Sequence, residues 1–231
     1  MKTIAMIPTY NEAGNIKKII DEILSCGENV EVLVVDDMSP DNTYEIVRLL
    51  AKTEPKINLL LRKEKKGRGY AGIDGFKKAL QMGADFILEM DGDGSHSPKY
   101  ISKFLDAIKD CDVVIGSRYI DGGKDEQRNF LRYAVSSFAR HYLAAVIGVK
   151  VKDPTSGFRL FRRNVIEKIA GELKANDPFI VAEVLYYLKK NNFIIKEYPI
   201  EFLSRISGES KLRPFTLIKY LFKVIKLRLS K

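Results

Sequence analysis

Two aspartates separated by a single glycine directly follow an apolar segment, in the sequence Glu89-Met-Asp91-Gly-Asp93-Gly-Ser-His96. In an extended or turning backbone, this spacing lets both carboxylates approach one point. Hard divalent cations prefer oxygen ligands, and Mg²⁺ is usually held by one or two carboxylates together with substrate phosphates. We therefore expect Asp91 and Asp93 to hold a divalent metal that neutralises a leaving diphosphate. The alternative is a turn at the end of a strand, where Asp and Gly are common.

A second acidic pair, Asp36 and Asp37, ends another apolar run. A carboxylate at this place can accept hydrogen bonds from a nucleobase N–H or from ribose hydroxyls. Helix capping is the competing explanation, and it accounts for Asp41, which precedes a segment of helical periodicity. Capping does not account for two aspartates placed directly after an apolar run, so this segment indicates a nucleotide site.

The elements before these aspartates have the pattern of strands that alternate with helices. Apolar runs predict strands at residues 3–7, 30–35, 57–61, 86–90 and 113–115, and helical periodicity predicts helices at residues 11–25, 43–52, 69–82 and 98–109. This alternation predicts an α/β fold with a mostly parallel, Rossmann-like sheet covered by helices on both faces. In such sheets ligands bind at the carboxyl ends of the strands, where both acidic pairs fall.

The second half of the chain predicts a long amphipathic helix at residues 130–149, a strand at 156–161, a helix at 179–190 and a strand at 193–203. A polar loop at residues 204–213 precedes a basic amphipathic helix at 214–229. Lysines on one face and apolar residues on another are typical of a helix in a membrane interface, or of a helix packed on its own domain. We expect one domain over residues 1–213 and a C-terminal helix over residues 214–231.

Composition narrows the possible partners. The net charge of +9 indicates nucleic acid, anionic lipid or a phosphorylated substrate. The sequence has no recognised nucleic-acid-binding motif, so we expect no nucleic acid partner. No glycine-rich dinucleotide fingerprint follows the first strand.

Cys26 and Cys111 lack metal-ligand spacing and indicate a reducing compartment. Without a signal peptide or an apolar run of roughly 18 residues, we expect a peripheral protein on the cytoplasmic face of a membrane.

Three segments, each at the end of an expected strand, resemble the family 2 glycosyltransferases of the GT-A fold: Pro8-Thr-Tyr-Asn-Glu12, Asp36-Asp37 and Asp91-Gly-Asp93. The segments at residues 116–119, 153–159 and 202–211 are similar to dolichyl-phosphate and polyprenyl-phosphate mannosyltransferases. This resemblance spans nearly the whole chain. It implies a GDP-mannose donor, Mg²⁺ or Mn²⁺ as cofactor, and a β-linked product formed on dolichyl or polyprenyl phosphate by inversion. It also implies a nucleotide-binding half at residues 1–120 and an acceptor half at 121–213.

The resemblance also implies roles for individual residues. Asp91 and Asp93 would hold the metal and, with Arg118, would be catalytic. The implied donor-binding residues are Pro8, Tyr10, Glu12, Val35, Asp37, Asp91, Gly92, Asp93, Arg118, Arg205 and Lys211. Among these, Arg205 and Lys211 would close over the diphosphate. The family often has Ala at position 92 and Gln at position 95, where this chain has Gly92 and Ser95, so no metal role is assigned to position 95.

A polar stripe along the helix expected at residues 130–149 is the candidate acceptor site. The side chains that recur at i+4 are Arg128, Arg132, Ser136 and Arg140. We predict that Arg132 and Ser136 bind the acceptor phosphate, because arginine suits forked hydrogen bonds to phosphate and the resemblance supports it. A solvated helix face is the alternative. Glu183, in an otherwise apolar helix, could orient Arg118 or Arg205, or could lie exposed.

A phosphate acceptor changes what the chemistry requires of the protein. A phosphate monoester is already anionic near neutral pH, so it can attack without a general base, unlike a sugar hydroxyl. The protein must then hold two anions in line and offset their repulsion. Two other interpretations stay open: a UDP-glucose-dependent polyprenyl-phosphate glucosyltransferase, and a non-catalytic nucleotide-sugar-binding protein.

Overall fold

A seven-stranded sheet runs through the molecule in the order β3-β2-β1-β4-β7-β5-β8 in this computed structural model. The structure describes residues 1–64, 66–126, 130–203 and 214–229, and of residues 130–136 and 214–219 it describes the backbone alone. Every neighbouring pair of strands is parallel except the two pairs that β7 makes with β4 and β5. The predicted mostly parallel sheet is therefore confirmed. The strands are β1 (Thr3–Thr9), β2 (Val30–Asp36), β3 (Ile57–Leu61), β4 (Phe86–Glu89), β5 (Val113–Ser117), β7 (Arg159–Arg162) and β8 (Ile195–Pro199).

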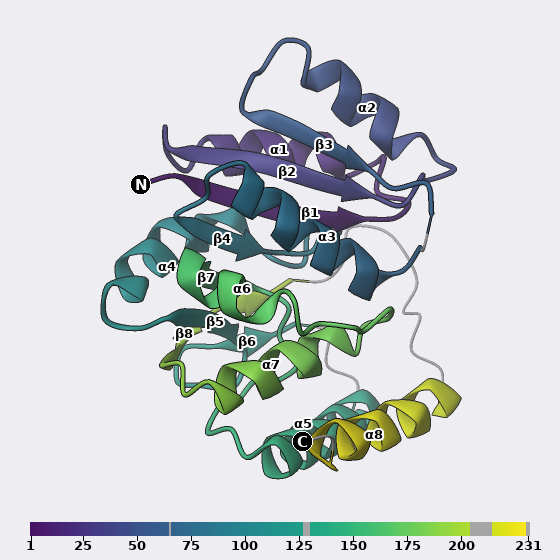
Figure 1. Ribbon diagram of the computed structural model, residues 1–231, viewed down its shortest axis with the longest axis vertical. Helices are drawn as coiled ribbons and strands as arrows, with labels where there is room; N and C mark the ends of the chain where they lie inside the picture. The colour runs from purple at the N-terminus through teal and green to yellow at the C-terminus, as the bar shows by residue number, and fades with distance from the viewer. Residues whose placement is uncertain (65, 127–129, 204–213, 230–231) are drawn as a thin grey trace.

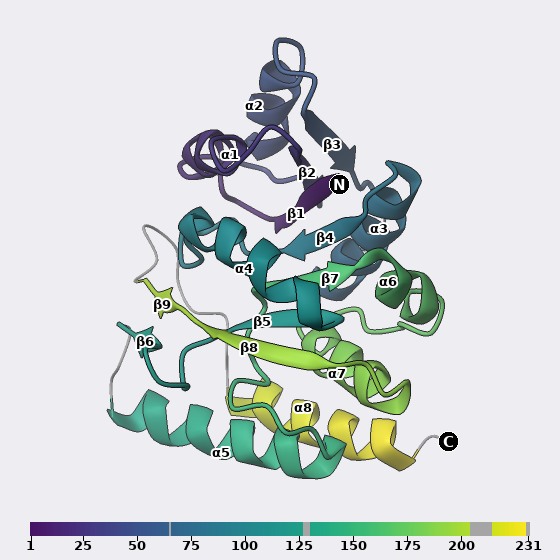
Figure 2. The ribbon, with the colours of Figure 1, turned by 90° about the vertical axis from the view of Figure 1, so that its left-hand side faces the viewer.

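Helices cover both faces of the sheet (Figures 1 and 2). One face packs against α1 (Ile16–Leu24), α2 (Thr43–Leu50) and α4 (Ile101–Ala107), which is flanked by 3₁₀ turns at Pro98–Tyr100 and Ile108–Asp110. The other face packs against α3 (Arg68–Gln81), α5 (Phe130–Ile147), α6 (Arg163–Ile169), α7 (Ile180–Lys190) and α8 (Pro214–Leu229). Because both faces are covered, four successive residues of β1 are fully buried and belong alternately to the two cores, namely Ile4, Ala5, Met6 and Ile7.

Some helices and strands differ from those predicted. The helix expected from residue 11 begins at Ile16, because Asn11 has a left-handed backbone with a φ of 63°. The strand expected at residues 156–161 is confined to β7. The sequence gives no sign of α6, whose seven residues follow β7 without a loop. The late start of α1 leaves residues 10–15 as a loop after β1.

The strand predicted at residues 193–203 is divided in two. β8 ends at Pro199, opposite Ser117, where its partner β5 also ends. The chain then loses its neighbour, and β9 (Glu201–Phe202) pairs instead with β6 (Lys124–Asp125) in a separate two-stranded sheet. The reason is that a strand continues only as far as a neighbour offers backbone groups to bond.

The C-terminal helix α8 packs along α5 and α7 (Figure 1). Val224 is fully buried, and the Tyr142 hydroxyl of α5 donates to the Leu221 carbonyl at 3.0 Å. Lys223 forms an ion pair with Asp177 at 2.5 Å. One face of α8 therefore belongs to the domain core.

Another face of α8 points to solvent. Phe222, Ile225 and Leu229 are 69%, 42% and 75% exposed. The apolar residues of α8 thus divide between two faces, whereas the sequence pattern placed them on one. Among the described residues, no helix is both long enough and apolar enough to cross a membrane.

Gly69, in the first turn of α3, allows close contact with the loop that precedes α7. A Cβ atom at this position would lie 2.2 Å from the carbonyl oxygen of Ala175. That loop cannot retreat easily, because the Glu183 carboxylate accepts the amides of Lys174 and Ala175. We expect Gly69→Ala to lower the free energy of unfolding in urea by about 1–3 kcal/mol. Gly171→Ala is the matched control, since its added Cβ would have no atom within 4 Å. Equal losses in both variants would contradict this account of Gly69.

Candidate functional site

The loops that follow β1, β2, β4 and β5 all lie at the carboxyl edge of the sheet, on the right in Figure 1. They carry most of the residues singled out from the sequence. The strand β7 adds a fifth segment to this edge. Because it runs antiparallel to β4 and β5, its amino end lies beside their carboxyl ends. Residues 153–158 therefore reach the same edge from the opposite chain direction.

The loop after β4 is fixed by its own side chains. The Asp93 Oδ1 atom accepts hydrogen bonds from the Ser95 amide at 3.0 Å and from the Ser95 hydroxyl at 2.5 Å. The Asp91 amide donates to Nδ1 of His96 at 3.0 Å. His96 is 2% exposed, and this burial lowers the pKa of its imidazole. The ring is therefore neutral, and Nδ1 can accept the hydrogen bond. Ser95 thus holds the Asp93 carboxylate in place. The family resemblance did not indicate this role for position 95.

Asp91 is the accessible member of the pair. Its side chain is 39% exposed, whereas the Asp93 residue is 8% exposed. Gly157 leaves room beside it, since an added Cβ there would lie 3.8 Å from both Asp91 carboxylate oxygens. The described residues contain no group of three or more His, Cys, Asp or Glu that could hold a metal. Two carboxylates fit a hard divalent cation whose remaining ligands come from a diphosphate and water.

Arg68 and Glu89 complete the charge balance next to Asp91, and sequence analysis gave neither of them a role. Arg68 Nη2 lies 2.8 Å from Glu89 Oε1 and 3.6 Å from Asp91 Oδ1. Burial alone would lower the pKa of Arg68, but Glu89 and Asp91 together raise it. The signal that could have found Glu89 is a charged residue at the last position of an apolar strand. Its 2% exposure makes a cationic partner necessary.

The acidic pair after β2 is bound within the protein. Asp36 is fully buried and accepts hydrogen bonds from the Thr9 hydroxyl at 2.9 Å and the Ser39 hydroxyl at 2.7 Å. Asp37 forms an ion pair with the buried Arg62 and accepts the Gly67 amide at 2.6 Å. Asp36 therefore joins β1 to β2, which explains one of the two aspartates. A nucleotide contact by Asp37 stays a prediction.

The donor residues predicted near the end of β1 lie in the strand itself and in the loop that follows it. This loop contacts the start of α2. Tyr10 is 43% exposed, and Glu12 Oε2 accepts the Asn15 amide group at 3.1 Å. Asp41 accepts the Ala13 amide at 2.9 Å and the Thr43 amide at 3.0 Å, so it joins this loop to the start of α2. Pro8 is half-buried within β1. Val35 is fully buried, so a nucleotide could contact it only through the backbone.

Arg118, directly after β5, is held by Asp153. The guanidinium donates to the two Asp153 carboxylate oxygens at 2.7 and 2.9 Å, and Nη2 also donates to the Thr155 hydroxyl at 2.8 Å. Asp153 is fully buried. Burial alone would raise the pKa of its carboxyl, but the bonds from Arg118 hold that pKa below its usual value. The pairing spans 35 residues of sequence, so spacing alone could not reveal it.

Glu183 does not have either of its expected positions. Its residue is 5% exposed, and its carboxylate accepts the amides of Lys174 and Ala175. It neither orients Arg118 nor lies exposed, because it is used to fix the loop before α7. A nearby buried arginine, Arg159, donates to the carbonyls of Val181 at 3.0 Å and Pro154 at 3.2 Å. Burial lowers the pKa of Arg159 to about 10.

The expected acceptor residues, and two of the expected donor residues, have side chains outside the described part of the chain. Arg132 and Ser136 lie in α5, but their side chains are not among those described, and Arg205 and Lys211 lie outside the described residues. Arg140, from the same stripe, lies with its guanidinium carbon 3.8 Å from the centre of the Tyr119 ring. The guanidinium carbon of Arg118 lies 5.1 Å from that ring centre. Arg140 therefore lies close to the segment that follows β5.

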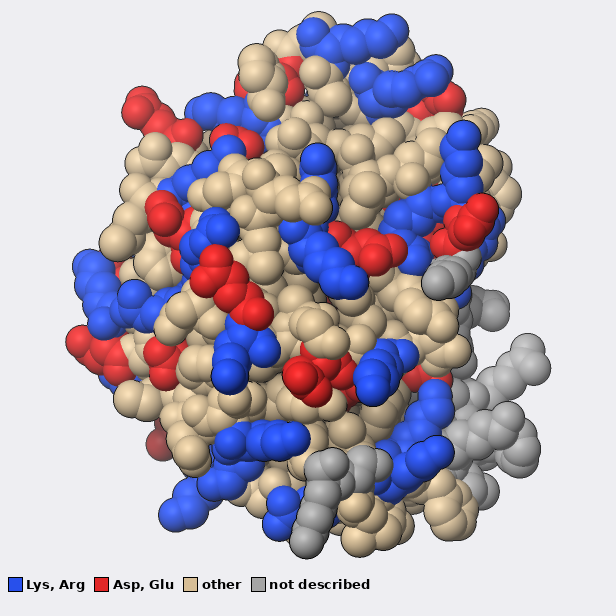
Figure 3. All heavy atoms as spheres, viewed as in Figure 1, with Lys and Arg blue, Asp and Glu red and all other residues tan. Residues whose placement is uncertain are grey.

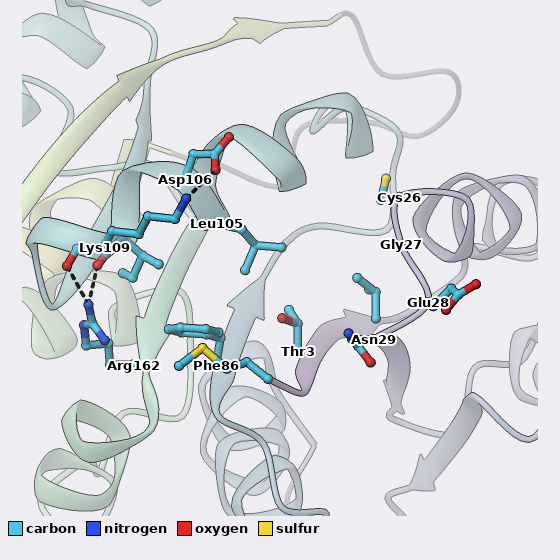
Figure 4. A pocket seen from close by; sticks show the side chains of 13 residues that line it. Thr3, Cys26, Gly27, Glu28, Asn29, Phe86, Leu105, Asp106, Lys109 and Arg162 are labelled. Carbon is cyan, nitrogen blue, oxygen red and sulfur yellow. Dashed lines mark hydrogen bonds and ion pairs between the residues drawn. The ribbon is translucent and has the colours of Figure 1, made fainter.

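A hollow at the opposite edge of the sheet does not have the character of an active site (Figure 4). It lies at the amino ends of β1, β2 and β4. Arg162 in its wall donates to the carbonyls of Ile108 and Cys111, and Lys109 pairs with Asp106. These charged groups are engaged with their own neighbours.

On the face in Figure 3, Lys and Arg side chains are interspersed with Asp and Glu and form no single-sign stripe.

Comparison with known proteins agrees with this geometry. Residues 4–170 match the family model described as glycosyl transferase family 2. A polyprenol monophosphomannose synthase of Mycolicibacterium smegmatis is 36% identical over 96% of this chain and 85% of that protein. An undecaprenyl-phosphate mannosyltransferase of Micrococcus luteus is 33% identical over 92% of this chain and 88% of that protein. A dolichol-phosphate mannosyltransferase of Pyrococcus furiosus is 37% identical over 98% of this chain and 64% of that protein.

Solved structures show the same GT-A fold at low sequence identity. Glucosyl-3-phosphoglycerate synthase of Mycobacterium tuberculosis, in complex with Mn²⁺, UDP-glucose and phosphoglyceric acid, has a TM-score of 0.70 and 19% identity. The match covers 99% of this chain and 79% of that one. The mannosyltransferase PcManGT of Pyrobaculum calidifontis, in complex with GDP-Man and Mn²⁺, has a TM-score of 0.57 and 18% identity, over 99% and 70% of the two chains.

Asp153→Asn tests the ion pair that holds Arg118. The variant removes the nearest carboxylate from a largely buried guanidinium, whose Nη1 also lies 4.0 Å from Asp125, so we expect a loss of about 3–5 kcal/mol in the free energy of unfolding at neutral pH. Because folding lowers the pKa of Asp153, the pair stabilises the protein above the unfolded pKa of about 3.9 and is lost as the pH falls. The difference between parent and variant should therefore shrink below about pH 4.

Urea unfolding over a pH series measures this difference. Glu201→Gln is the control, because Glu201 forms ion pairs with Lys99 and Lys124 at the surface, and surface ion pairs contribute little. We expect it to leave the stability nearly unchanged. A parent–variant difference for Asp153→Asn that stays constant down to pH 2 would show that the carboxylate charge is not what stabilises Arg118.

Proposed function

Because the chain belongs to glycosyl transferase family 2, we propose that it transfers mannose from GDP-mannose to a polyprenyl or dolichyl phosphate with inversion at the anomeric carbon. The chain is a glycosyltransferase, and its named relatives act in polyprenyl-phosphate mannose transfer. The observation that carries the proposal is that these three relatives align over more than nine-tenths of the chain. The particular nucleotide, the anomer and the residue roles are the proposed part.

On the donor side, Asp91 and Asp93 would hold Mg²⁺ or Mn²⁺. Such a cation would neutralise the leaving diphosphate. Two solved structures of the same fold hold Mn²⁺ together with a nucleotide sugar, which supports this assignment. Within the chain, Ser95 fixes the Asp93 carboxylate, and Arg68 supplies positive charge within 3.6 Å of Asp91. The nucleotide would extend from there toward the loops after β1 and β2, with Tyr10 and Asp37 among its contacts.

On the acceptor side, a phosphate oxygen attacks the anomeric carbon while the bond from that carbon to the diphosphate breaks. The electron pair of that bond leaves with the diphosphate. No proton must be removed, so the protein contributes orientation and positive charge instead. Arg118, fixed by Asp153, would offset the charge of the two anions, and Arg132 and Ser136 would bind the acceptor phosphate. The pairing of Arg118 with a buried carboxylate favours a fixed rather than a mobile charge at this place.

We also propose that the protein meets its acceptor at a membrane surface through α5 and α8. Phe222, Ile225 and Leu229 stand at i, i+3 and i+7 on α8 and are exposed, and so is Phe138 of α5. Exposed cations beside them on α8, at Lys226 and Arg228, suit anionic lipid head groups. The amino ends of both helices lie on the side of the molecule to which the strands point (Figures 1 and 2). A lipid that lies along the two helices, with its phosphate toward their amino ends, could present that phosphate to the carboxyl edge.

A donor panel tests the proposed reaction. GDP-mannose, UDP-glucose and GDP-glucose are supplied one at a time with a polyprenyl phosphate and Mg²⁺ or Mn²⁺. The product is identified by mass, and its anomer by the one-bond NMR coupling between the anomeric carbon and its proton. We expect a β-linked hexosyl polyprenyl phosphate from GDP-mannose alone. Asp93→Asn, folded by circular dichroism, should give background turnover because a proposed metal ligand is lost.

Each other result has a distinct meaning. Product from UDP-glucose would replace mannose with glucose, and an α-linked product would contradict inversion. Nucleotide-sugar binding with no turnover on any donor would make the chain a binding protein. Near-normal turnover by Asp93→Asn would remove the metal role of that residue.

Vesicle flotation tests the proposed membrane surface. We expect the intact chain to float with vesicles that contain anionic lipid. The double variant Phe222→Ser and Leu229→Ser should partition roughly a hundredfold more weakly or worse, because each large apolar side chain contributes roughly 1.5–3 kcal/mol on burial. Leu49→Ser is the matched control, since Leu49 is 58% exposed on α2, outside the α5–α8 pair. Unchanged flotation of the double variant would contradict the proposal.

A further inference from the structure

His96 is a buried polar residue that the proposed reaction does not use. Its residue is 2% exposed, and its ring stacks on Phe158 with the ring centres 4.9 Å apart and the planes inclined by 15°. The ring of Phe202 packs against it edge-on, with centres 5.4 Å apart. Two aromatic contacts from different segments therefore set the orientation of the imidazole. A histidine so fixed presents its nitrogen atoms in constant directions.

One of these directions leads to the backbone of Asp91. The Asp91 amide donates to His96 Nδ1 at 3.0 Å. A backbone amide can only donate, so Nδ1 is the unprotonated nitrogen of the ring. The bond closes the loop of residues 91–96 across five residues. Within this loop, Ser95 holds the Asp93 carboxylate. Each of the two aspartates is thus fixed by a different side chain of the same loop.

The carboxylate of Asp91 lies near the side chains of Arg68 and His96. Its oxygen atoms lie 3.6 Å from Arg68 Nη2 and 3.9 Å from His96 Nδ1. The carboxylate is also carried by the Asp91 backbone, and His96 holds the amide of that backbone. Gly157, on the far side, leaves space next to the carboxylate oxygens.

We propose that His96 is a positioning residue for the divalent cation: through Nδ1 it fixes the backbone of Asp91, and thereby the carboxylate that receives the metal. This inference rests on the proposed metal role of Asp91 and Asp93. The ring would not touch the cation, because Nδ1 is occupied by the Asp91 amide. Outer residues that orient metal ligands typically change metal affinity by about tenfold to a hundredfold when they are replaced.

Two substitutions separate the hydrogen bond from the packing. His96→Phe retains an aromatic ring between Phe158 and Phe202 but removes the acceptor. His96→Asn removes the ring but can bring an amide oxygen close to the place of Nδ1, because both atoms are two bonds from Cβ. A purely structural role predicts that the two variants lose metal affinity in step with their loss of thermal stability. A positioning role predicts that they separate.

The measurement is Mn²⁺ affinity of the full chain in the presence of GDP, by electron paramagnetic resonance of free Mn²⁺, together with the thermal midpoint. We expect His96→Phe to bind Mn²⁺ about tenfold to a hundredfold more weakly with a thermal midpoint near that of the parent. His96→Asn should bind Mn²⁺ within about threefold of the parent at a lower thermal midpoint, because the acceptor is kept and the ring contacts are lost.

Four results would overturn the inference. They are parent-like Mn²⁺ affinity in His96→Phe, weak binding in folded His96→Asn, loss in both variants in proportion to stability, and a parent chain that binds Mn²⁺ no better than Asp93→Asn. The last result removes the proposed metal site itself, and the first three leave that site intact. If His96→Phe does not fold, the His96→Asn result still decides, because a folded chain that retains the acceptor must retain the metal.

Discussion

The burial of both faces of a parallel sheet is the constraint on which the site depends. Residues in β1 and β2 contact one apolar core or the other, so a polar side chain within a strand would lose its solvation. In the central strands, charged groups therefore stand at or next to the strand ends, and parallel strands end at one edge. Asp37, Asp91 and Arg118 follow three different strands and share this edge for that reason. The chemistry of the chain is concentrated by topology rather than by sequence proximity.

The single antiparallel strand supplies what the parallel strands cannot. β7 lies between β4 and β5 and brings its amino end to the edge where they finish. The segment before it contributes Asp153, which holds Arg118, and Phe158, on which His96 stacks. Gly157 leaves space beside the Asp91 carboxylate. The second half of the chain therefore completes the binding edge of the first, within one continuous sheet.

Charges at the edge are matched before any ligand binds. Asp37 pairs with Arg62, Glu89 with Arg68 and Asp153 with Arg118. A buried carboxylate without a partner would destabilise the fold, so each pair is a structural requirement as well as part of the site. Asp91, with a side chain 39% exposed, stands at the solvent side of this arrangement. A cation arriving from solvent would meet a carboxylate whose surroundings are already set.

The sequence by itself determined the fold class, the family, and the position of the acidic segments directly after predicted strands. These were accessible because apolar periodicity and short motifs are local properties. It placed Asp91 and Asp93 after a strand, and the comparisons confirm the resemblance that it carried. Only the tertiary structure decided which cation meets which carboxylate, that Glu183 fixes a loop, and that the apolar residues of α8 divide between core and solvent. Arg118 and Asp153, for example, lie 35 residues apart. Their pairing follows from strand order and packing, which spacing along the chain does not encode.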